Sequence, residues 1–330
     1  MLNTNGYMPS VPIEVASVGV DLGGNIVVPP GGRVFFVRGN GTTVTQYADD
    51  QTDPYMSQFT GKLLPSVEAA LALCTANRGD RIIVHPRHTQ NIANGTTFSN
   101  ALVAGVKIIG LGVGTERPTF TFSAGASKIT INAASVGIYN CRFLCAGPPG
   151  TTAITVAAPF AVTAANVCFS GNYFQAGIDV DQFCQAFLTT TAAATGFNFS
   201  NNEVESLDPA ALIVSGVTLT GVDGAKIINN VFYGSLSATT MGWVRIFTTA
   251  CRNVTISGNR VTHTLANSTV GIDLTASLAN SGIVALNRIK VGTGTAPFGA
   301  ISATMNVMLE DNYVFNGTNT RGLIVGTAAA

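Results

Sequence analysis

Apolar and polar residues alternate along most of this chain, and the alternation follows a short phrase that recurs seven times. Each phrase has apolar residues at every second position, then a small or polar residue, an Asn, and another apolar residue soon after it. The gaps between successive asparagines are 32, 30, 28, 29, 28 and 25 residues. The seven positions are Asn140, Asn172, Asn202, Asn230, Asn259, Asn287 and Asn312. The period-two alternation predicts short β-strands, and a repeat of this length predicts a solenoid or a propeller.

The residue before each Asn predicts how the strands are joined. It is Gly, Asn or Asp in five of the phrases, as in Gly171-Asn172 and Asp311-Asn312. These residue types accept a left-handed backbone conformation at small cost. We therefore predict one such bend per coil, with equivalent asparagines stacked at roughly 4.8 Å and their amides hydrogen-bonded as a ladder. Seven ordinary hairpin turns are the alternative, although hairpins would not keep so constant an interval.

A second set of apolar segments follows the Asn bends. These segments are centred on Ile154, Phe187, Ile213, Val244, Ile272, Ile301 and Ile324. Two or three strands per repeat, with the same bend each time, are typical of a parallel β-helix, so the predicted fold class is all-β. Over residues 62–326 the chain resembles the right-handed parallel β-helix proteins with pectate-lyase-like topology, and in particular their non-enzymatic members in tailed-phage particles.

Residues 1–61 lack the repeat and are predicted to be a separate N-terminal arm or docking module, with the β-helix over 62–330. Ser66 as N-cap, Glu68 in the first turn and apolar residues at helical spacing predict a helix over 66–78, ended by Gly79. The resemblance implies that this helix caps the solenoid. The arm is rich in aromatic residues, which are candidate docking residues because aromatic side chains anchor interfaces. They are Phe35, Phe36, Tyr47, Tyr55 and Phe59.

Charged residues are scarce, at 10% of the chain, and 17 basic residues balance 17 acidic ones. No basic stripe is visible, so we expect no nucleic-acid partner. Residues 147–178 carry no charge, but prolines and polar residues interrupt them. They are therefore interpreted as stacked buried strands and not as a membrane span. The first residues lack the basic region and apolar core of a secretory signal, so we expect synthesis in the host cytoplasm.

The sequence contains few candidate catalytic residues. The best carboxylate cluster is interpreted as a solvated loop edge between coils, and its members are Asp179, Asp181, Glu203, Glu205 and Asp208. Polygalacturonase-like enzymes of this fold carry several catalytic phrases, and the resemblance would imply them here. Arg288-Ile289-Lys290 matches one but lies inside the ordinary repeat, the pair Asp49-Asp50 lies outside the predicted solenoid, and Gly-His-Gly does not occur. His85 and His88 are interpreted as exposed loop residues, and Cys141 and Cys168 are predicted to point into the coil. We therefore expect no catalytic residues, no cofactor and no metal site.

The resemblance implies a structural role in a virion. The expected function is a phage capsid decoration or cement protein that docks on the major capsid protein through residues 1–61 and forms homotrimers. The alternative is a tailspike-like receptor-binding protein or polysaccharide depolymerase, with a host surface glycan as its ligand. A free polysaccharide lyase or hydrolase is the third hypothesis, and it would be expected to carry a secretory signal.

Overall fold

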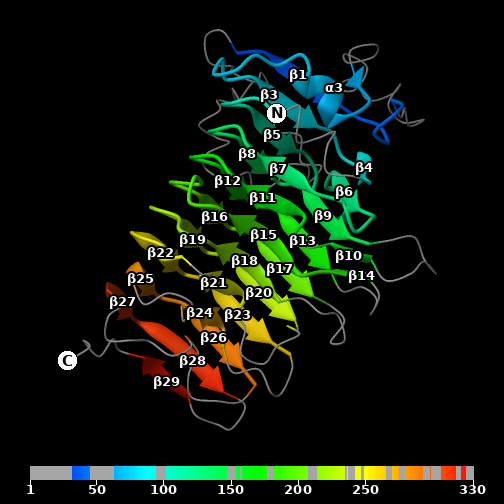
Figure 1. Ribbon diagram of the computed structural model, residues 1–330. Helices are drawn as coiled ribbons and strands as arrows, with labels where there is room; N and C mark the ends of the chain where they lie inside the picture. The colour runs from blue at the N-terminus through cyan, green and yellow to red at the C-terminus, as the bar shows by residue number, and fades with distance from the viewer. Residues whose placement is uncertain are drawn as a thin grey trace, which may run out of the picture.

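In the computed structural model, the described parts of the chain are a stack of parallel strands wound into a rod (Figure 1). They comprise residues 32–44, 63–93, 102–146, 154–156, 158–176, 182–206, 214–234, 236, 242–246, 249–264, 270–274, 279–292, 298, 306–316 and 321–324. Strand pairs in this part of the chain are parallel, apart from β28 with β29 and an isolated antiparallel bridge between Gly39 and Val44. The all-β parallel β-helix predicted from the Asn repeat is confirmed.

The strands form three long sheets and one short one. The eleven-stranded sheet contains, in spatial order, β2 (Leu63–Leu64), β1 (Val34–Val37), β3 (Arg81–Val84), β5 (Lys107–Gly110), β8 (Gly137–Tyr139), β12 (Cys168–Ser170), β16 (Asn198–Ser200), β19 (Lys226–Ile228), β22 (Val254–Ser257), β25 (Ser281–Ala285) and β27 (Asn306–Glu310). The ten-stranded sheet contains β4 (Thr89–Ile92), β6 (Thr119–Phe122), β9 (Arg142–Cys145), β13 (Tyr173–Ala176), β17 (Glu203–Ser206), β20 (Val231–Gly234), β23 (Arg260–His263), β26 (Arg288–Val291), β28 (Asn312–Asn316) and β29 (Arg321–Ile324). The six-stranded sheet contains β7 (Ile129–Ile131), β11 (Phe160–Val162), β15 (Ala186–Thr190), β18 (Ser215–Leu219), β21 (Val244–Ile246) and β24 (Ile272–Asp273), and a pair is formed by β10 (Ile154–Val156) and β14 (Gln182–Cys184).

The coils from β5 to β24 visit the three long sheets in the same order. A strand of the eleven-stranded sheet leads through a two-residue bend into the ten-stranded sheet, as β12 leads into β13. The chain then reaches the six-stranded sheet and returns to the eleven-stranded one. Successive coils pair in register, so equivalent residues form columns parallel to the rod axis.

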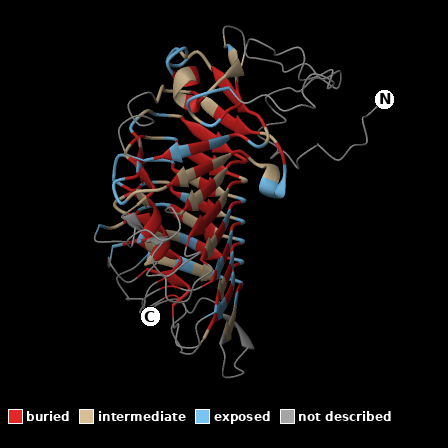
Figure 2. Cartoon of the chain, turned by 90° about the vertical axis from the view of Figure 1, so that its right-hand side faces the viewer, coloured by how far each residue is buried: buried red, intermediate tan, exposed pale blue. Residues whose placement is uncertain are grey.

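Aromatic side chains fill the middle of the rod. Because side chains alternate across a strand, every second residue points inward. Phe120, Phe143 and Phe174 are in register on neighbouring strands, with ring centroids 5.5 and 5.2 Å apart. Phe160 of the six-stranded sheet meets Phe143 edge-on at 4.8 Å. Each buried Phe contributes about 1.5–3 kcal/mol. Figure 2 shows buried residues along most of the rod axis.

The helix at the N-terminal end is shorter than predicted. Helix α3 spans Val67–Leu71, and the Ser66 hydroxyl accepts the Ala69 N–H at 3.1 Å, as expected of an N-cap. The predicted end at residue 78 is wrong, because the Thr75 N–H donates to the Asp80 carboxylate at 2.7 Å and not to a helical carbonyl. A short 3-10 helix, η2 (Gly114–Glu116), is also present. Helix α3 still covers the first coil, since its buried apolar residues join the core.

Part of the predicted N-terminal arm belongs to the solenoid. Strand β1 pairs in parallel register with β3 and lies between β3 and β2. Phe35 packs against the main core, and Phe36 packs against an outer cluster of Ile83, Ile109, Tyr139 and Cys168. The prediction that 1–61 is a separate module, with Phe35 and Phe36 free to dock, is therefore wrong for residues 32–44. Tyr47, Tyr55 and Phe59 lie outside the described residues.

The cysteines divide between two environments. Cys141 is buried in the main core, as predicted, and the six cysteines are free. Cys168 lies instead in the outer cluster, because Phe169 takes the inward position on β12 and alternation sends Cys168 to the other face. No helix in the described parts of the chain has the length and apolar character needed to cross a bilayer.

Candidate functional site

Six of the seven repeated asparagines form a buried ladder, from Asn172 to Asn312. At each step the Oδ1 atom of one Asn accepts two hydrogen bonds from the Asn one coil earlier, one from its backbone N–H and one from its Nδ2–H. Asn230 Oδ1, for example, lies 2.8 Å from the backbone N of Asn202 and 3.2 Å from its Nδ2. Each Nδ2 also donates to a backbone carbonyl of the preceding coil, such as Phe169 for Asn202 at 3.0 Å. The amides are satisfied and no more than 1% exposed. The ladder is therefore an internal scaffold and not a ligand site.

Asn140 is outside the ladder, which corrects the prediction by one residue. Cys141 occupies the equivalent position, and its backbone N–H donates to Asn172 Oδ1 at 2.9 Å. Asn140 has φ 53° and donates through Nδ2 to the carbonyls of Gly110 and Gly112. The left-handed residue is thus the one before the ladder position. Along the rod this residue is Asn140, Gly171, Asn201, Asn229, Gly258, Leu286 and Asp311.

The ladder sets which side chains face solvent on the ten-stranded sheet. The first and third residues after each ladder Asn point outward, and β4, β6 and β9 continue the same register. These side chains make two columns along the sheet. The first column is Thr89, Thr119, Arg142, Tyr173, Glu203, Val231, Arg260, Arg288 and Tyr313. The second is Asn91, Thr121, Leu144, Gln175, Glu205, Tyr233, Thr262, Lys290 and Phe315. We call these two columns the outer face, and neighbours along each lie roughly 4.8 Å apart.

The middle of the outer face is a connected polar network. Arg142 Nη2 donates to Gln175 Oε1 at 2.9 Å, and its guanidinium lies 5.6 Å from the centroid of the Tyr173 ring. The Tyr173 hydroxyl donates to Glu205. Burial, and then the hydrogen bond to Glu205, raise the pKa of Tyr173 well above its usual range. The phenol therefore stays protonated and holds Glu205 as an acceptor.

A basic and aromatic cluster follows toward the C-terminal end of the face. Arg260 lies directly opposite Arg288 on the next strand, and Lys290 lies two residues further along that strand. These three side chains are exposed. They are flanked by Val231 and Tyr233 on β20 and by Tyr313 on β28, and the two tyrosines are 44% and 43% exposed. Like charges placed opposite each other destabilise a sheet, so folding alone does not favour this pair.

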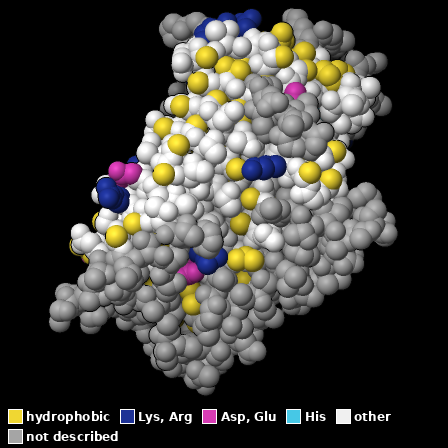
Figure 3. Space-filling model, in the orientation of Figure 1, with side chains coloured by type: hydrophobic (Ala, Val, Ile, Leu, Met, Phe, Trp, Pro, Cys, Tyr) yellow, Lys and Arg dark blue, Asp and Glu magenta, His cyan; other side chains and the backbone are white. Residues whose placement is uncertain are grey.

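The basic cluster is a local feature of two coils that the sequence analysis did not identify. On the side of the rod seen in Figure 3, charged side chains occur as isolated spots among uncharged ones. The three cations come from two separate repeats and meet only through sheet register. A signal was present in the sequence, because the residue after each ladder Asn faces outward and two consecutive repeats carry Arg there.

Two members of the predicted carboxylate cluster share the outer face. Glu203 and Glu205 lie two residues apart on β17, about 6.6 Å along the strand. That spacing suits an inverting glycosidase, but such an enzyme keeps one carboxyl protonated in an apolar site. Glu203 is exposed and Glu205 is bound by Tyr173, so the pair lies on an open sheet. Asp179, Asp181 and Asp208 lie outside the described residues.

A buried ion pair elsewhere among the described residues has a structural role. Arg245 pairs with Asp273 at 3.3 Å on the six-stranded sheet, with side chains 16% and 4% exposed. This carboxylate is already matched by a cation in register with it. In the part of the chain that the structure describes, no group of three or more His, Cys, Asp or Glu is placed to hold a metal ion.

The histidines are buried, which overturns the prediction that His85 and His88 are exposed. They are 1% and 0% exposed. His88 Nδ1 accepts the Gly39 N–H at 3.0 Å, and Nε2 lies 3.3 Å from Gln90 Oε1. Burial lowers the pKa of His88 to about 4. The turn carrying Gly39 folds back over β4, and that contact could not be read from the local sequence.

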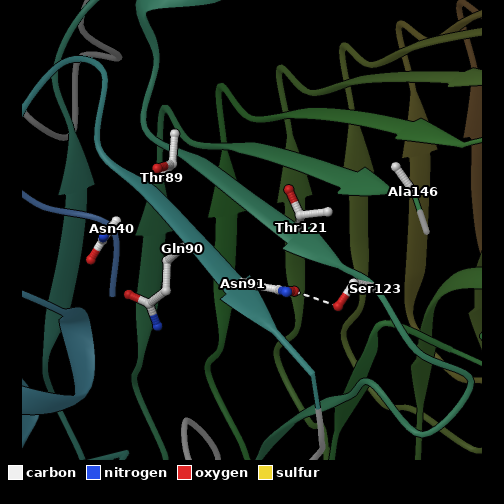
Figure 4. A pocket seen from close by; sticks show the side chains of 7 residues that line it. All are labelled: Asn40, Thr89, Gln90, Asn91, Thr121, Ser123 and Ala146. Atoms are coloured by element: carbon white, nitrogen blue, oxygen red, sulfur yellow. Dashed lines mark hydrogen bonds between the residues drawn. The ribbon is translucent and has the colours of Figure 1, made fainter. Parts of the chain in front are cut away.

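A shallow pocket of about 370 Å³ lies at the N-terminal end of the outer face (Figure 4). Outward side chains of β4 and β6, the residues that follow β6 and β9, and the turn after β1 line it. Those residues are Asn40, Thr89, Asn91, Thr121, Ser123 and Ala146. Gln90 also contributes. The pocket is therefore lined by hydroxyl, amide and methyl groups without a charged side chain.

Comparisons with known proteins add little to this geometry. No family model matches the chain, and no curated protein matches it. Among solved structures, the chain is similar to the crystal structure of pectate lyase Pel9A, with a TM-score of 0.41 and 13% sequence identity. The match covers 88% of this chain and 78% of that one.

Proposed function

We propose that this protein is a non-catalytic β-helix that binds an acidic polysaccharide along the outer face of its ten-stranded sheet. The observation that carries the proposal is the cluster of Arg260, Arg288 and Lys290 between exposed tyrosines. Function has to be argued from such a site, since the fold alone hosts many activities.

The chemistry of the cluster fits a carboxylate-bearing sugar polymer. An Arg guanidinium matches a carboxylate with two parallel hydrogen bonds, and Lys adds a point charge. Tyr233 and Tyr313 offer apolar ring faces with a polar tip, which suit sugar rings that have both C–H and O–H groups. The equal spacing of the columns suits a ligand that is itself a linear repeat. An anion bound between Arg260 and Arg288 would also relieve their mutual repulsion.

This proposal favours the receptor-binding alternative over capsid decoration. The docking prediction relied on aromatic residues of a free arm, and two of them, Phe35 and Phe36, contribute to the packing of the solenoid. The outer face instead offers exposed aromatic and charged groups. The virion setting, synthesis in the host cytoplasm, the homotrimer and docking on the major capsid protein stay predictions from the resemblance. A host surface glycan is the ligand that the proposal adopts.

The test is affinity electrophoresis of the full chain through gels containing alginate, an acidic polymer, or dextran, a neutral one. We expect alginate to retard the protein, with binding weakened on the order of tenfold in Arg260→Gln/Arg288→Gln, because two charge-assisted hydrogen bonds are lost. Lys226→Gln/Arg252→Gln is the matched control, since both cations are exposed and lie away from the outer face. Equal retardation of the two double variants would contradict the proposal. Release of reducing ends or unsaturated products from alginate would overturn its non-catalytic part.

A further inference from the structure

We propose that the pocket at the N-terminal end of the outer face is a separate binding site for one uncharged sugar residue at the end of a glycan chain. The inference rests on the proposed function, because it adds a terminal subsite to the same face. The pocket lies on the column that continues through Leu144 and Gln175 toward the basic cluster.

The floor of the pocket is held rigid by buried hydrogen bonds. Gln90 is 4% exposed, and its Nε2 donates to both carboxylate oxygens of Glu68, at 2.7 and 2.6 Å. Its Oε1 accepts the Val67 N–H at 3.2 Å and lies 3.3 Å from His88 Nε2. The amide therefore has one orientation before any ligand arrives, and a fixed site avoids the entropic cost of ordering side chains on binding.

The wall that closes the pocket is equally fixed. Asn40 Oδ1 accepts hydrogen bonds from the backbone and the hydroxyl of Thr42 and Thr43. The Gly39 N–H donates to His88, and the Gly41 N–H donates to the Pro65 carbonyl at 3.1 Å. A Cβ at Gly39 would lie 2.2 Å from the Thr43 carbonyl oxygen, so the close approach of this turn requires glycine. A polymer running along the face ends against this wall.

The exposed lining has the hydrogen-bonding character of a neutral ligand site. Asn91 Oδ1 accepts from the Ser123 hydroxyl, which directs the Asn91 Nδ2 donors elsewhere. Thr121 is in register with Asn91 on the adjacent strand, and Thr89 lies two residues before Asn91 on β4. The hydroxyl groups of Thr89 and Thr121 serve as both donor and acceptor. Sugar hydroxyl groups have the same dual character, whereas a carboxylate would find no cation among the lining residues. The volume lies in the range of small-ligand sites and suits one monosaccharide.

Saturation-transfer difference NMR on the full chain tests the proposal. The probes are the methyl α- and β-glycosides of glucose, galactose and N-acetylglucosamine. We expect at least one to bind, and its binding to weaken about fivefold to tenfold in Thr121→Val and in Ser123→Ala, since each removes one hydroxyl at nearly constant volume. Thr262→Val is the matched control, because Thr262 occupies the same column as Thr121 but lies on β23, away from the pocket.

The outcomes separate this inference from the proposed function. Glycoside binding that is lost in Thr121→Val and kept in both Thr262→Val and Arg260→Gln/Arg288→Gln supports the pocket. Absence of binding by any of the glycosides, or equal weakening in Thr121→Val and Thr262→Val, overturns it. Retardation by alginate depends on Arg260 and Arg288, so that measurement alone tests the proposed binding of an acidic polysaccharide. A variant that fails to fold is recognised by its urea midpoint, and the other hydroxyl variant then gives the answer.

Discussion

Two lines of left-handed bends run along the rod, and they use the same backbone conformation for different reasons. The first line leads into the ten-stranded sheet and carries the Asn ladder. The second leads into the eleven-stranded sheet. Its left-handed residues are Asn77, Gly105, Ser135, Asn166, Gly196, Gly224 and Asn253. Most left-handed residues of both lines donate their backbone N–H to a carbonyl of the next coil, as Asn201 does to Ile228 and Asn166 does to Thr195. Asn253 donates instead to the Ser281 hydroxyl at 3.2 Å.

The difference lies in the residue that follows the bend. In the first line it is a buried Asn, whose amide satisfies polar groups of the two neighbouring coils. In the second line the residue after the bend is mostly a buried apolar one, such as Val136, Val167 or Phe197, whose role is packing. From Gly171 onward the residue after each bend of the first line is therefore always Asn, with Cys141 in that position one coil earlier, while the residues of the second line vary. A residue can recur because its side chain is needed or because its backbone conformation is needed, and only the first reason leaves a strict sequence signature.

The largest expected effect tests the side-chain role of the ladder. Asn230→Ala should lower the free energy of unfolding by about 3–5 kcal/mol, because the Asn202 backbone N–H, one Nδ2–H of Asn202 and the Phe199 carbonyl each lose a buried hydrogen bond to Asn230. Urea denaturation gives the measurement. Asn229→Gly is the control, since Asn229 is exposed with φ 56° and glycine adopts that conformation freely. Similar losses in the two variants would remove the distinction between the bends.

The second test compares the ladder amides with an imidazole in the same role. His88 accepts a buried backbone N–H as the ladder Asn residues do, but it can titrate. Its folded pKa of about 4 lies below the usual 6.5, so the folded state binds fewer protons. The neutral, buried His88 therefore contributes to the free energy of unfolding above pH 6.5. That contribution, up to about 3 kcal/mol, is lost as the pH falls from 6.5 through 4.

The measurement is the pH dependence of urea unfolding in the wild type and in His88→Gln. The difference between the two curves removes the contribution of His263, whose pKa burial also lowers to about 4. We expect the wild type to lose stability more steeply than the variant between pH 6.5 and 4. Parallel curves would show that the imidazole at residue 88 is not the titrating acceptor.

The third test concerns the one apolar residue in the first line of bends. Leu286 has φ 58° and is 60% exposed, and a branched residue in that conformation costs about 1–2 kcal/mol. Leu286→Asn should therefore raise the free energy of unfolding by about 1 kcal/mol, while leaving the buried Asn287 in place. The urea midpoint measures the change. A decrease in stability would mean that the exposed Leu286 side chain makes a stabilising contact.

The smallest effect is expected in the second line of bends. Asn166 is exposed with φ 57°, and only its backbone conformation is required there. Asn166→Gly should change the free energy of unfolding by less than about 0.5 kcal/mol. Asn166→Val at the same position should cost more, because a β-branched residue resists the left-handed region. A large loss in Asn166→Gly would reveal a side-chain role and weaken the contrast between the two lines.

The parts of the fold that were predictable are those governed by local or strictly periodic physics. The interval between Asn residues indicated the parallel coils, because stacked strands of equal length return the same position to the same place. Ser66 was recognised as an N-cap because its hydroxyl bonds within its own helix. The outer-face residues from β13 onward were also implicit, since one column follows the ladder Asn residues by one residue and the other follows them by three. The shift of the ladder from Asn140 to Cys141 was missed, because Asn occurs there at the left-handed position and matches the phrase by composition.

The winding of the coil follows from the sequence, because period-two strands and one recurring bend are short-range properties of the chain. Contacts between distant segments depend on the folded rod. The Asp80 carboxylate accepts the backbone N–H of Thr75, just beyond helix α3, and this contact keeps the helix from continuing. It also accepts the backbone N–H of Arg33, 47 residues away. Gly39 meets His88 across 49 residues, and Arg260 faces Arg288 across one coil. The free energies of such contacts depend on burial and register, which exist only after the chain has wound into the rod.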